Sequence, residues 1–367
     1  GTYDLLQRKH TISRNYPITA NFRYLLESVG PEIRQYFIQS DTEERPFSRE
    51  QRTIVYQRAK NILDKRPFGS QLGMYDEGFE WMNHTLTPTR MTSSDFRILI
   101  GKNCEKPYSA SVFNISAMSF GSLSANAILS LNTGARMGGF YHDTGEGSIS
   151  RYHLQPGGDL VWEIGSGYFG CRNTDGSFNE EMFRKNAALE PVKMIEVKLS
   201  QGAKPGHGGI LPGAKVTPEI AEARGVAVGE DCISPARHSA FSTPVELLEF
   251  IDHLRDLSGG KPVGFKLAIG HPWEWFAIVK AMLKTGRKPD FIVVDGGEGG
   301  TGAAPLEFIN RLGMPMTEAL LLVHNTLVGA NLREDIAVGA AGKITSAFNI
   351  ARTLALGADW CNAARGY

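Results

Sequence analysis

From residue 110 onward, short apolar segments alternate with segments of helical pattern. This alternation is typical of parallel β/α folds, because a crossover must separate one parallel strand from the next. The predicted strands cover residues 111–117, 140–144, 160–164, 192–199, 263–269, 290–295, 335–340 and 358–363. The predicted helices cover residues 122–137, 179–188, 217–224, 243–257, 272–285, 315–328 and 345–356.

Eight strands favour a closed TIM (β/α)8 barrel of the α/β class over residues 110–367. An open doubly wound sheet would also be parallel, but its G-x-G-x-x-G dinucleotide fingerprint is missing from the first turn. The eighth predicted strand ends close to Tyr367. The barrel is therefore expected to be truncated after that strand and to lack its last helix.

Residues 1–109 are expected to form an N-terminal extension that is partly helical and partly irregular. Ser48 can cap a helix that runs toward Leu63, because a serine hydroxyl accepts a hydrogen bond from an unpaired amide of the first turn. Segment 67–109 is rich in Gly, Pro, Thr and Ser, which predicts irregular connections with short strands.

Charge and cysteine usage narrow the functional class. Lysine plus arginine (39) equals aspartate plus glutamate (39), so no overall basic field favours nucleic acid. No apolar run approaches the roughly 18 residues of a membrane span. The four cysteines are far apart, which suits reduced thiols and a cytoplasmic location, and neither cysteines nor histidines show metal-ligand spacing.

The segment MIEVKLSQGAKPGHGGILPG (194–213) runs from a strand into a glycine-rich loop. Lys198 stands at a strand position where another aliphatic residue would be expected, and Gln201 and Lys204 follow it. Glycines allow close backbone approach, so such a loop can bind an anion or a flat ring. Other unusual residues also follow predicted strands, at 118–121, 144–147, 295–302 and 342–343, so one rim of the barrel should hold the active site.

Five motifs in these loops resemble the FMN-binding synthase domain of glutamate synthase, especially its shorter stand-alone relatives. They are NISAMSFGSLS (114–124), DTGEGS (143–148), KLSQGAKPGHGGILPGAKV (198–216), EGGTGAAPL (298–306) and HNTLV (324–328). The resemblance covers about residue 65 to the end of the chain. It implies a TIM-barrel oxidoreductase, acting on CH–NH2 donors, that binds FMN and reductively aminates 2-oxoglutarate with ammonia, through 2-iminoglutarate, to L-glutamate.

The resemblance also implies roles for individual residues. Those expected at the reacting carbon are Glu146, Gln201 and Lys204. Those expected to bind the substrate are Ser119, Gly121, Ser122, Lys204 and Arg224. Those expected to contact FMN are Met118, Ser119, Thr144, Lys198, Gln201, Lys266, Gly299, Gly300, Thr301, Gly302, Gly342, Lys343, Ala364 and Arg365, with the last four at the phosphate.

Two departures from the family pattern leave the substrate open. His207 replaces a glutamate of the family's loop, and Ile210 replaces a glutamine that resembles a substrate contact. One alternative is a related FMN barrel acting on another amino or keto acid, as in glutamate N-methyl transfer subunits. A second, from a different class, is a flavin-binding assembly subunit without turnover, since some relatives carry membrane-anchoring N-terminal segments.

Partners are implied in the same way. No nicotinamide fingerprint and no N-terminal amidotransferase cysteine are present, so ammonia and electrons should come from separate subunits or from ferredoxin. Members of the family carry a three-iron four-sulfur (3Fe-4S) cluster on cysteines beyond the eighth strand. That cluster is expected only in a longer chain, because Cys361 alone cannot hold it. An oligomer is expected.

Overall fold

The computed structural model describes residues 2–7, 9–38, 45–63, 65, 67–204, 208–301 and 304–367. The chain forms two compact units, Gly1–Trp81 and Met82–Tyr367. The pattern of the sequence placed the boundary between residues 109 and 110, whereas the compact unit that contains the barrel begins at Met82.

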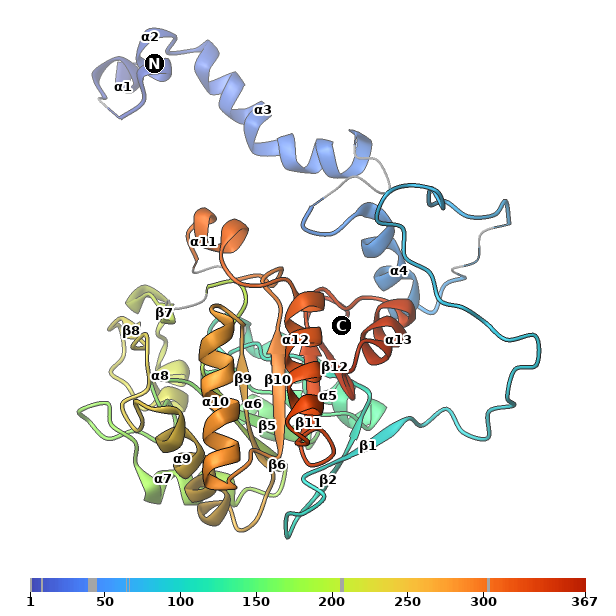
Figure 1. Ribbon diagram of the computed structural model, residues 1–367. Coiled ribbons are helices and arrows are strands. Elements are labelled where there is room, and N and C mark those ends of the chain that lie inside the picture. Colours follow the sequence, from blue (N-terminus) through green and yellow to red (C-terminus); the bar gives the residue numbers. More distant parts are fainter. Residues whose placement is uncertain are drawn as a thin grey trace. The chain divides into compact units, whose positions relative to one another are not determined.

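Eight parallel strands close into a barrel in the second unit (Figure 1). They are β3 (Phe113–Ile115), β4 (His142–Asp143), β5 (Leu160–Ile164), β6 (Val192–Lys198), β9 (Val263–Leu267), β10 (Phe291–Asp295), β11 (Ala337–Ala341) and β12 (Trp360–Ala363). Neighbours around the barrel follow the order β10-β11-β12-β3-β4-β5-β6-β9. The TIM-barrel prediction is confirmed, and each strand overlaps its predicted range.

Helices lie between the strands; most cover the outside of the barrel, whereas α11, which buries no side chain, projects beyond the ends of the strands (Figure 1). They are α5 (Ala125–Gly138), α6 (Arg151–Leu154), α7 (Glu180–Ala187), α8 (Pro218–Arg224), α9 (Pro244–Leu257), α10 (Pro272–Thr285), α11 (Leu306–Arg311), α12 (Met316–Gly329) and α13 (Ala347–Ala355), with a 3-10 turn η2 (Gly213–Lys215). Side-chain caps define several starts: Thr243 and Ser346 each form a capping box with the residue three positions on. Gly225 and Gly286 end α8 and α10 in the left-handed conformation that glycine adopts without strain.

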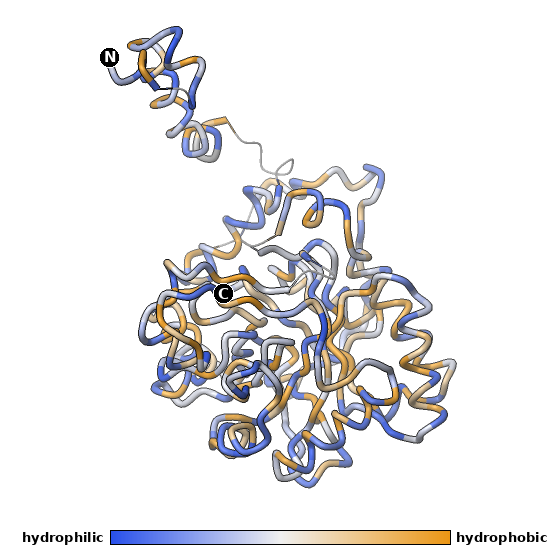
Figure 2. The backbone as a smooth tube through the Cα atoms, turned by 90° about the vertical axis from the view of Figure 1, so that its left-hand side faces the viewer, coloured by the Kyte–Doolittle hydropathy of each residue, from blue (hydrophilic) through white to orange (hydrophobic). Residues whose placement is uncertain are grey.

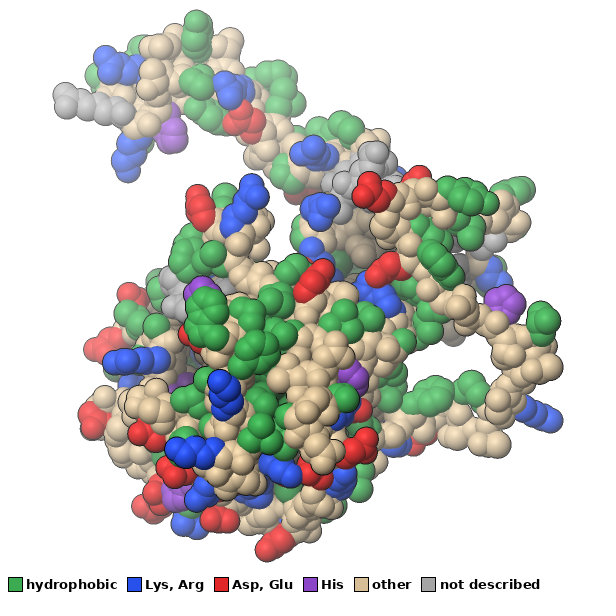
Figure 3. Space-filling view, in the orientation of Figure 1, with side chains coloured by type: hydrophobic (Ala, Val, Ile, Leu, Met, Phe, Trp, Pro, Cys, Tyr) green, Lys and Arg blue, Asp and Glu red, His purple; other side chains and the backbone are tan. Residues whose placement is uncertain are grey.

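Apolar side chains of strands and helices form one large core around the barrel. In the backbone view of Figure 2, hydrophobic stretches run through this unit. On the face shown in Figure 3, positive and negative side chains are intermingled, which agrees with the zero net charge.

A second apolar cluster fills the lower interior of the barrel, where Met194, Phe291 and Trp360 are fully buried. An antiparallel hairpin, β1 (Arg97–Ile100) and β2 (Tyr108–Ser111), packs against this cluster. The Tyr108 hydroxyl donates to Asp159, which immediately precedes β5, at 2.9 Å. The hairpin therefore closes the end of the barrel where the strands begin, and leaves the opposite end for ligands.

The first unit contains α1 (Thr2–Leu6), α2 (Thr11–Asn15), α3 (Thr19–Ile33), a π-helix η1 (Arg34–Ile38) and α4 (Arg49–Ala59). The predicted cap at Ser48 is confirmed, because its side chain accepts from the Gln51 amide in a capping box. The helix ends at Ala59, before the predicted Leu63. Residues 67–96 form neither helix nor strand. None of the helices in the described part of the chain combines the length and the hydropathy that spanning a bilayer requires.

Candidate ligand site at the carboxyl end of the barrel

An ion pair joins two loops at the carboxyl ends of the strands. Lys198, the last residue of β6, places its Nζ 3.1 Å from Oε2 of Glu146, which lies in the loop after β4. Both side chains are largely buried, with 12% and 17% exposed. Two glycines make room for the carboxylate: a Cβ on Gly209 would lie 2.3 Å from Glu146 Oε1, and one on Gly165 would lie 3.2 Å from Glu146 Cβ. The glycine-rich loop therefore closes directly over Glu146.

Two further cations lie near this pair. Lys204 and Arg224 are buried, each with 4% of its surface exposed. Burial lowers the pKa of Lys204, although the Glu146 charge opposes that effect. Burial raises the pKa of Glu146, but the attraction of Lys198 and then Lys204 and Arg224 is larger in sum and holds it below its ordinary value. Glu146 is therefore ionised at neutral pH.

The cations outnumber the carboxylate. Within the described part of the chain, no carboxylate lies within ion-pair distance of Lys204 or Arg224. The Nε of Arg224 is buried and has no hydrogen-bond partner among the described residues. Three cations and one anion leave a local excess of two positive charges, which suits an anionic ligand.

The loop after β3 is hydrogen-bonded to Arg224. Arg224 Nη2 donates to the Phe120 carbonyl at 3.1 Å, and the ring of Phe169 lies 5.0 Å from its guanidinium carbon. Gly121 has a φ of +104°, and a Cβ there would lie 3.4 Å from Arg224 Nη2. The Ser119 and Ser122 hydroxyls are 3.0 Å apart. The structure therefore brings together the predicted substrate residues of this loop and Arg224.

The same loop also touches the loop that carries Glu146. A Cβ on Gly145 would lie 2.7 Å from the Ser119 nitrogen, so only glycine allows this approach. Met118 is half-buried beside it. Thr144 is fully buried; its hydroxyl donates to the Gly145 carbonyl and accepts from the Glu163 amide at 3.1 Å. Ser119 and Met118 thus lie at the rim, whereas the Thr144 side chain is part of the barrel wall.

Gly202, the residue after Gln201, is held by Asp295, which stands in the predicted rim segment 295–302 but was given no individual role. The Gly202 amide donates to Oδ2 of Asp295, at the end of β10, at 3.0 Å. A Cβ on Gly202 would lie 1.6 Å from the Gly296 carbonyl oxygen, so glycine is required there. Asp295 therefore positions the loop that carries Gln201 and Lys204. Asp295 could have been recognised in the sequence, because it is a carboxylate at the end of an otherwise apolar strand.

The predicted phosphate residues follow adjacent strands. Lys343 follows β11 with a φ of +51°, and Ala364 and Arg365 follow β12, where both are exposed. The two loops are in contact, since a Cβ on Gly366 would lie 3.0 Å from the Ile344 carbonyl oxygen.

Near the end of β10, Gly300 has open space around it, and Gly299 has only ordinary contacts. Thr301 is described, whereas the predicted contact Gly302 and the substituted His207 lie outside the described residues.

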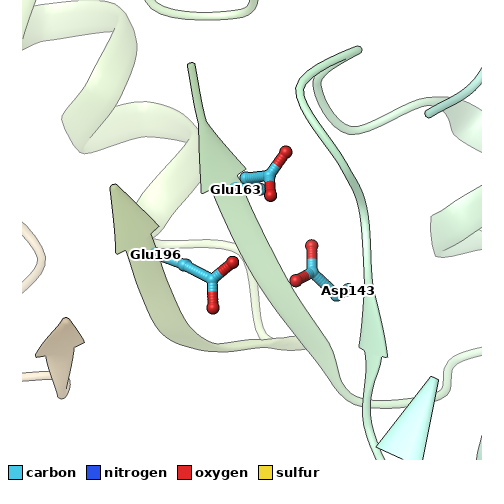
Figure 4. A group of neighbouring side chains, drawn as sticks. All are labelled: Asp143, Glu163 and Glu196. Carbon is cyan, nitrogen blue, oxygen red and sulfur yellow. The ribbon is translucent and has the colours of Figure 1, made fainter. Parts of the chain in front are cut away.

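Lys266 differs from the other predicted cofactor residues. Its side chain, 5% exposed, forms an ion pair with Glu163 and lies 3.5 Å from Oε1 of Glu196. Together with Asp143, these carboxylates form a buried acidic group inside the barrel (Figure 4). The sequence analysis gave none of the three acids a role, although Glu163 and Glu196 each interrupt an apolar strand and Asp143 begins the DTGEGS motif. Among the described residues, this is the one group of three acidic, histidine or cysteine side chains close enough to share a metal ion.

A family model described as a conserved region in glutamate synthase matches residues 82–367. The chain belongs to the glutamate synthase family. It is 39% identical over 404 residues to the glutamate synthase large subunit-like protein YerD of Bacillus subtilis, covering 99% of this chain and 77% of that protein. It is 36% identical over 246 residues to the archaeal glutamate synthase [NADPH] of Methanocaldococcus jannaschii, covering 67% of this chain and 45% of that protein.

Archaeal-type relatives are longer than this chain. For the archaeal-type glutamate synthase [NADPH] of Thermotoga neapolitana, 36% identity extends over 244 residues, or 66% of this chain and 45% of that protein. Among solved structures, a mandelate oxidase variant with (S)-mandelic acid has a TM-score of 0.46 at 16% identity, covering 76% of this chain and 71% of that one. The family membership therefore rests on the sequence matches, and the fold rests on the barrel described above.

Proposed function

We propose that this glutamate synthase family barrel binds FMN and reductively aminates 2-oxoglutarate with ammonia to L-glutamate, using electrons from a separate donor. The observation that carries the proposal is the group of Lys198, Lys204 and Arg224 around Glu146 at the rim. Its excess of two positive charges matches the two carboxylates of the keto acid. A charged hydrogen bond contributes about 1.5–3 kcal/mol, enough to select a dicarboxylate over a monocarboxylate.

The rim also fits FMN. Gly300 leaves open space beyond the end of β10, and Lys343 and Arg365 follow β11 and β12, where TIM barrels commonly bind a phosphate. FMN held at this rim would supply the redox chemistry of the reaction. Lys198, held in place by its ion pair with Glu146, would be one of the residues that contact it.

Glu146 and its neighbours can accept and donate protons during the reaction. Glu146 is ionised at neutral pH, so its carboxylate can stabilise a positive iminium carbon or accept a proton. Burial lowers the pKa of Lys204, which makes its ammonium a better proton donor. Gly121 and Ser122 would orient one substrate carboxylate, and Arg224 would donate to it from its Nε, which has no partner among the described residues.

A second candidate is a keto or amino acid other than 2-oxoglutarate. Ile210, in β7 (Ile210–Leu211), is 45% exposed and pairs with Ile233 of β8 (Cys232–Ile233), which is 61% exposed. These two residues form an apolar ledge next to Gly209, the residue that touches Glu146. A ledge of this kind favours a substrate with an apolar portion, as the substitution of the family's glutamine by Ile210 suggests.

Partners follow from the reaction. Ammonia and electrons would be supplied by separate subunits or by ferredoxin. Among the described residues, no cysteine belongs to a group of three or more potential metal ligands, so the four cysteines are not proposed to hold the 3Fe-4S cluster.

The test is a product assay. Protein reconstituted with FMN is supplied with 2-oxoglutarate, isotope-labelled ammonia and reduced ferredoxin. The labelled glutamate that forms is quantified by mass spectrometry. Glutamate formation supports the proposal. FMN binding with turnover of a different keto acid supports the second candidate. FMN binding without turnover of any acid supports the assembly subunit.

A further inference from the structure

Three carboxylates and one ammonium form a charged layer inside the barrel, here called the acid layer: Asp143, Glu163, Glu196 and Lys266. The acids come from β4, β5 and β6, and one oxygen of each lies within 4.8 Å of the others (Figure 4). Each acid is 1% exposed. Glu163 and Glu196 are direct neighbours in the register of β5 and β6. The acid layer therefore belongs to the barrel interior, and Lys198 follows two residues after Glu196 at the rim.

The charges of the acid layer do not balance if every carboxylate is ionised. Three carboxylates and the Lys266 ammonium would leave two negative charges in a space closed to water, and isolated buried charge is strongly unfavourable. Carboxylates that share a site retain protons for this reason. Burial and then the Glu163 charge raise the pKa of Asp143 to about 7. Burial and then Asp143 raise the pKa of Glu196 well above its ordinary value.

The surrounding groups do not remove the imbalance. Asp295 is a further buried acid near Lys266 and Glu163, and Tyr141 lies near Glu196 and Asp143. Lys198 is directed to Glu146. Oε1 of Glu196 is buried and has no hydrogen-bond partner among the described residues. A proton on Glu196 would make its carboxyl group a hydrogen-bond donor to Asp143.

We propose that Glu196 and Asp143 form a proton-sharing acid pair, and that this pair is a proton-exchange site beneath the candidate ligand site. Glu196 keeps one proton and donates it to Asp143, and Glu163 forms the ion pair with Lys266. One further proton then enters or leaves at Asp143. The existence of the pair depends only on the acid layer, whereas its coupling to a ligand rests on the proposed function.

Asp143 is connected to the rim by the backbone. Its Oδ1 accepts from the Gly145 amide at 3.0 Å, and Gly145 directly precedes Glu146. Negative charge added at the ligand site would raise the proton affinity of Asp143 by Coulomb repulsion. Asp143 would then take up one proton from solvent, and would release it when that charge leaves. The acid pair therefore limits the charge that builds up inside the barrel during reduction.

Infrared spectroscopy of the cofactor-free protein tests the acid pair. At about pH 8, where ordinary carboxylates are ionised, the wild-type protein should show the carbonyl band of a protonated carboxyl group. Glu196→Gln should lose that band. A second band should grow in the wild-type protein as the pH falls through neutrality, and Asp143→Asn should lose this growth while keeping an acceptor for Gly145. Glu190→Gln, on a side chain that is 85% exposed, is the control and should change neither band.

Two results would overturn the acid pair. One is the absence of any protonated carboxyl band in the wild-type protein at that pH, a measurement that does not depend on the folding of a variant. The other is a divalent cation bound in a one-to-one ratio in the purified protein, found by elemental mass spectrometry, whose removal makes the band appear. That outcome would assign the acid layer to a metal.

Coupling to the ligand site has its own readout. With FMN bound, the reduction potential of the wild-type protein should change slope with pH near neutrality, and Asp143→Asn should lose this inflection. Identical slopes in the two proteins would overturn the coupling. If FMN does not bind, the proposed function fails while the infrared result still decides the acid pair.

Discussion

Lys198 and Lys266 are aligned in register on the neighbouring strands β6 and β9, yet their ammonium groups bind carboxylates at different levels of the barrel. Lys198 reaches the rim and binds Glu146, whereas Lys266 binds Glu163 in the interior. One lysine therefore contributes charge to the candidate ligand site, and the other compensates charge below it.

Lys198→Met should weaken FMN binding and lower the reduction potential of the bound flavin, because it removes a cation from the rim. It should also raise the pKa of Glu146, which loses its nearest opposite charge. Flavin content after dialysis and a redox titration measure these effects. Lys193→Met is a matched control on the same strand, because Lys193 pairs with Glu190 and Asp159 away from the rim. Full flavin occupancy at an unchanged potential would remove Lys198 from the site.

Arg224→Ala should raise the apparent substrate constant for 2-oxoglutarate by roughly 10- to 150-fold, the equivalent of about 1.5–3 kcal/mol for one charged hydrogen bond. The flavin spectrum should be unchanged. Arg172→Ala is the control, since Arg172 also stacks on Phe169, at 5.3 Å. Because Arg224 also binds the Phe120 carbonyl, Arg224→Lys is measured alongside. Equal substrate constants for wild type and both Arg224 variants would contradict a substrate role.

Ile210→Gln should distinguish the two substrate candidates by the sign of its effect. If 2-oxoglutarate is the substrate, the new amide gains a polar partner and turnover with 2-oxoglutarate rises. If the natural substrate packs an apolar portion on the ledge, an amide buried without a partner costs about 1–3 kcal/mol and turnover of that substrate falls. Steady-state kinetics with a panel of keto acids measures the change. Leu283→Gln, an exposed aliphatic side chain on α10 (58% exposed), is the control, and no change of the Ile210 variant with any acid would leave the ledge outside the site.

Lowering the pH should destabilise the barrel through two buried histidines. Burial lowers the pKa of His142 from 6.5 to about 4, and burial and then His142 lower that of His153 well below its ordinary value. The unfolded state therefore binds more protons below about pH 6.5. Stability from His142 is complete above that pH and is lost as the pH falls through 4, by roughly 3 kcal/mol in the free energy of unfolding.

Denaturant unfolding at a series of pH values measures this loss. His142→Phe, which cannot bind a proton, should flatten the dependence between about pH 6.5 and 4. His84→Phe is the control, because His84 is exposed. A wild-type unfolding free energy that stays constant over this range would show that His142 does not titrate on unfolding.

The hydrophobic periodicity of the sequence predicted the strands and helices of the barrel close to their observed bounds. The predicted segments 160–164 and 272–285 match β5 and α10 residue for residue. Their bounds depend on neighbouring residues alone: an apolar run defines the strand, and a proline at the start and a glycine after the end define the helix. The two-residue strands β7 and β8 were missed, and the short strands expected within 67–109 were given neither bounds nor the pairing that β1 and β2 have. Their pairing depends on contacts between distant residues, which a local pattern does not contain.

The order of residues was enough to predict the barrel, the family and the rim that carries Glu146 and Lys198, since parallel strands place their carboxyl ends at one edge. The partner of each charged side chain depends on the folded arrangement of the strands and loops. Lys198 and Lys266 occupy equivalent strand positions, and their partners come from other strands: Glu146 from the loop after β4 and Glu163 from β5. Glu163 and Glu196 look like isolated charges in separate strands, and the pairing of β4, β5 and β6 brings them together with Asp143. Electrostatic energy depends on the distance between charges and on their burial, and neither can be predicted from neighbouring residues in the sequence.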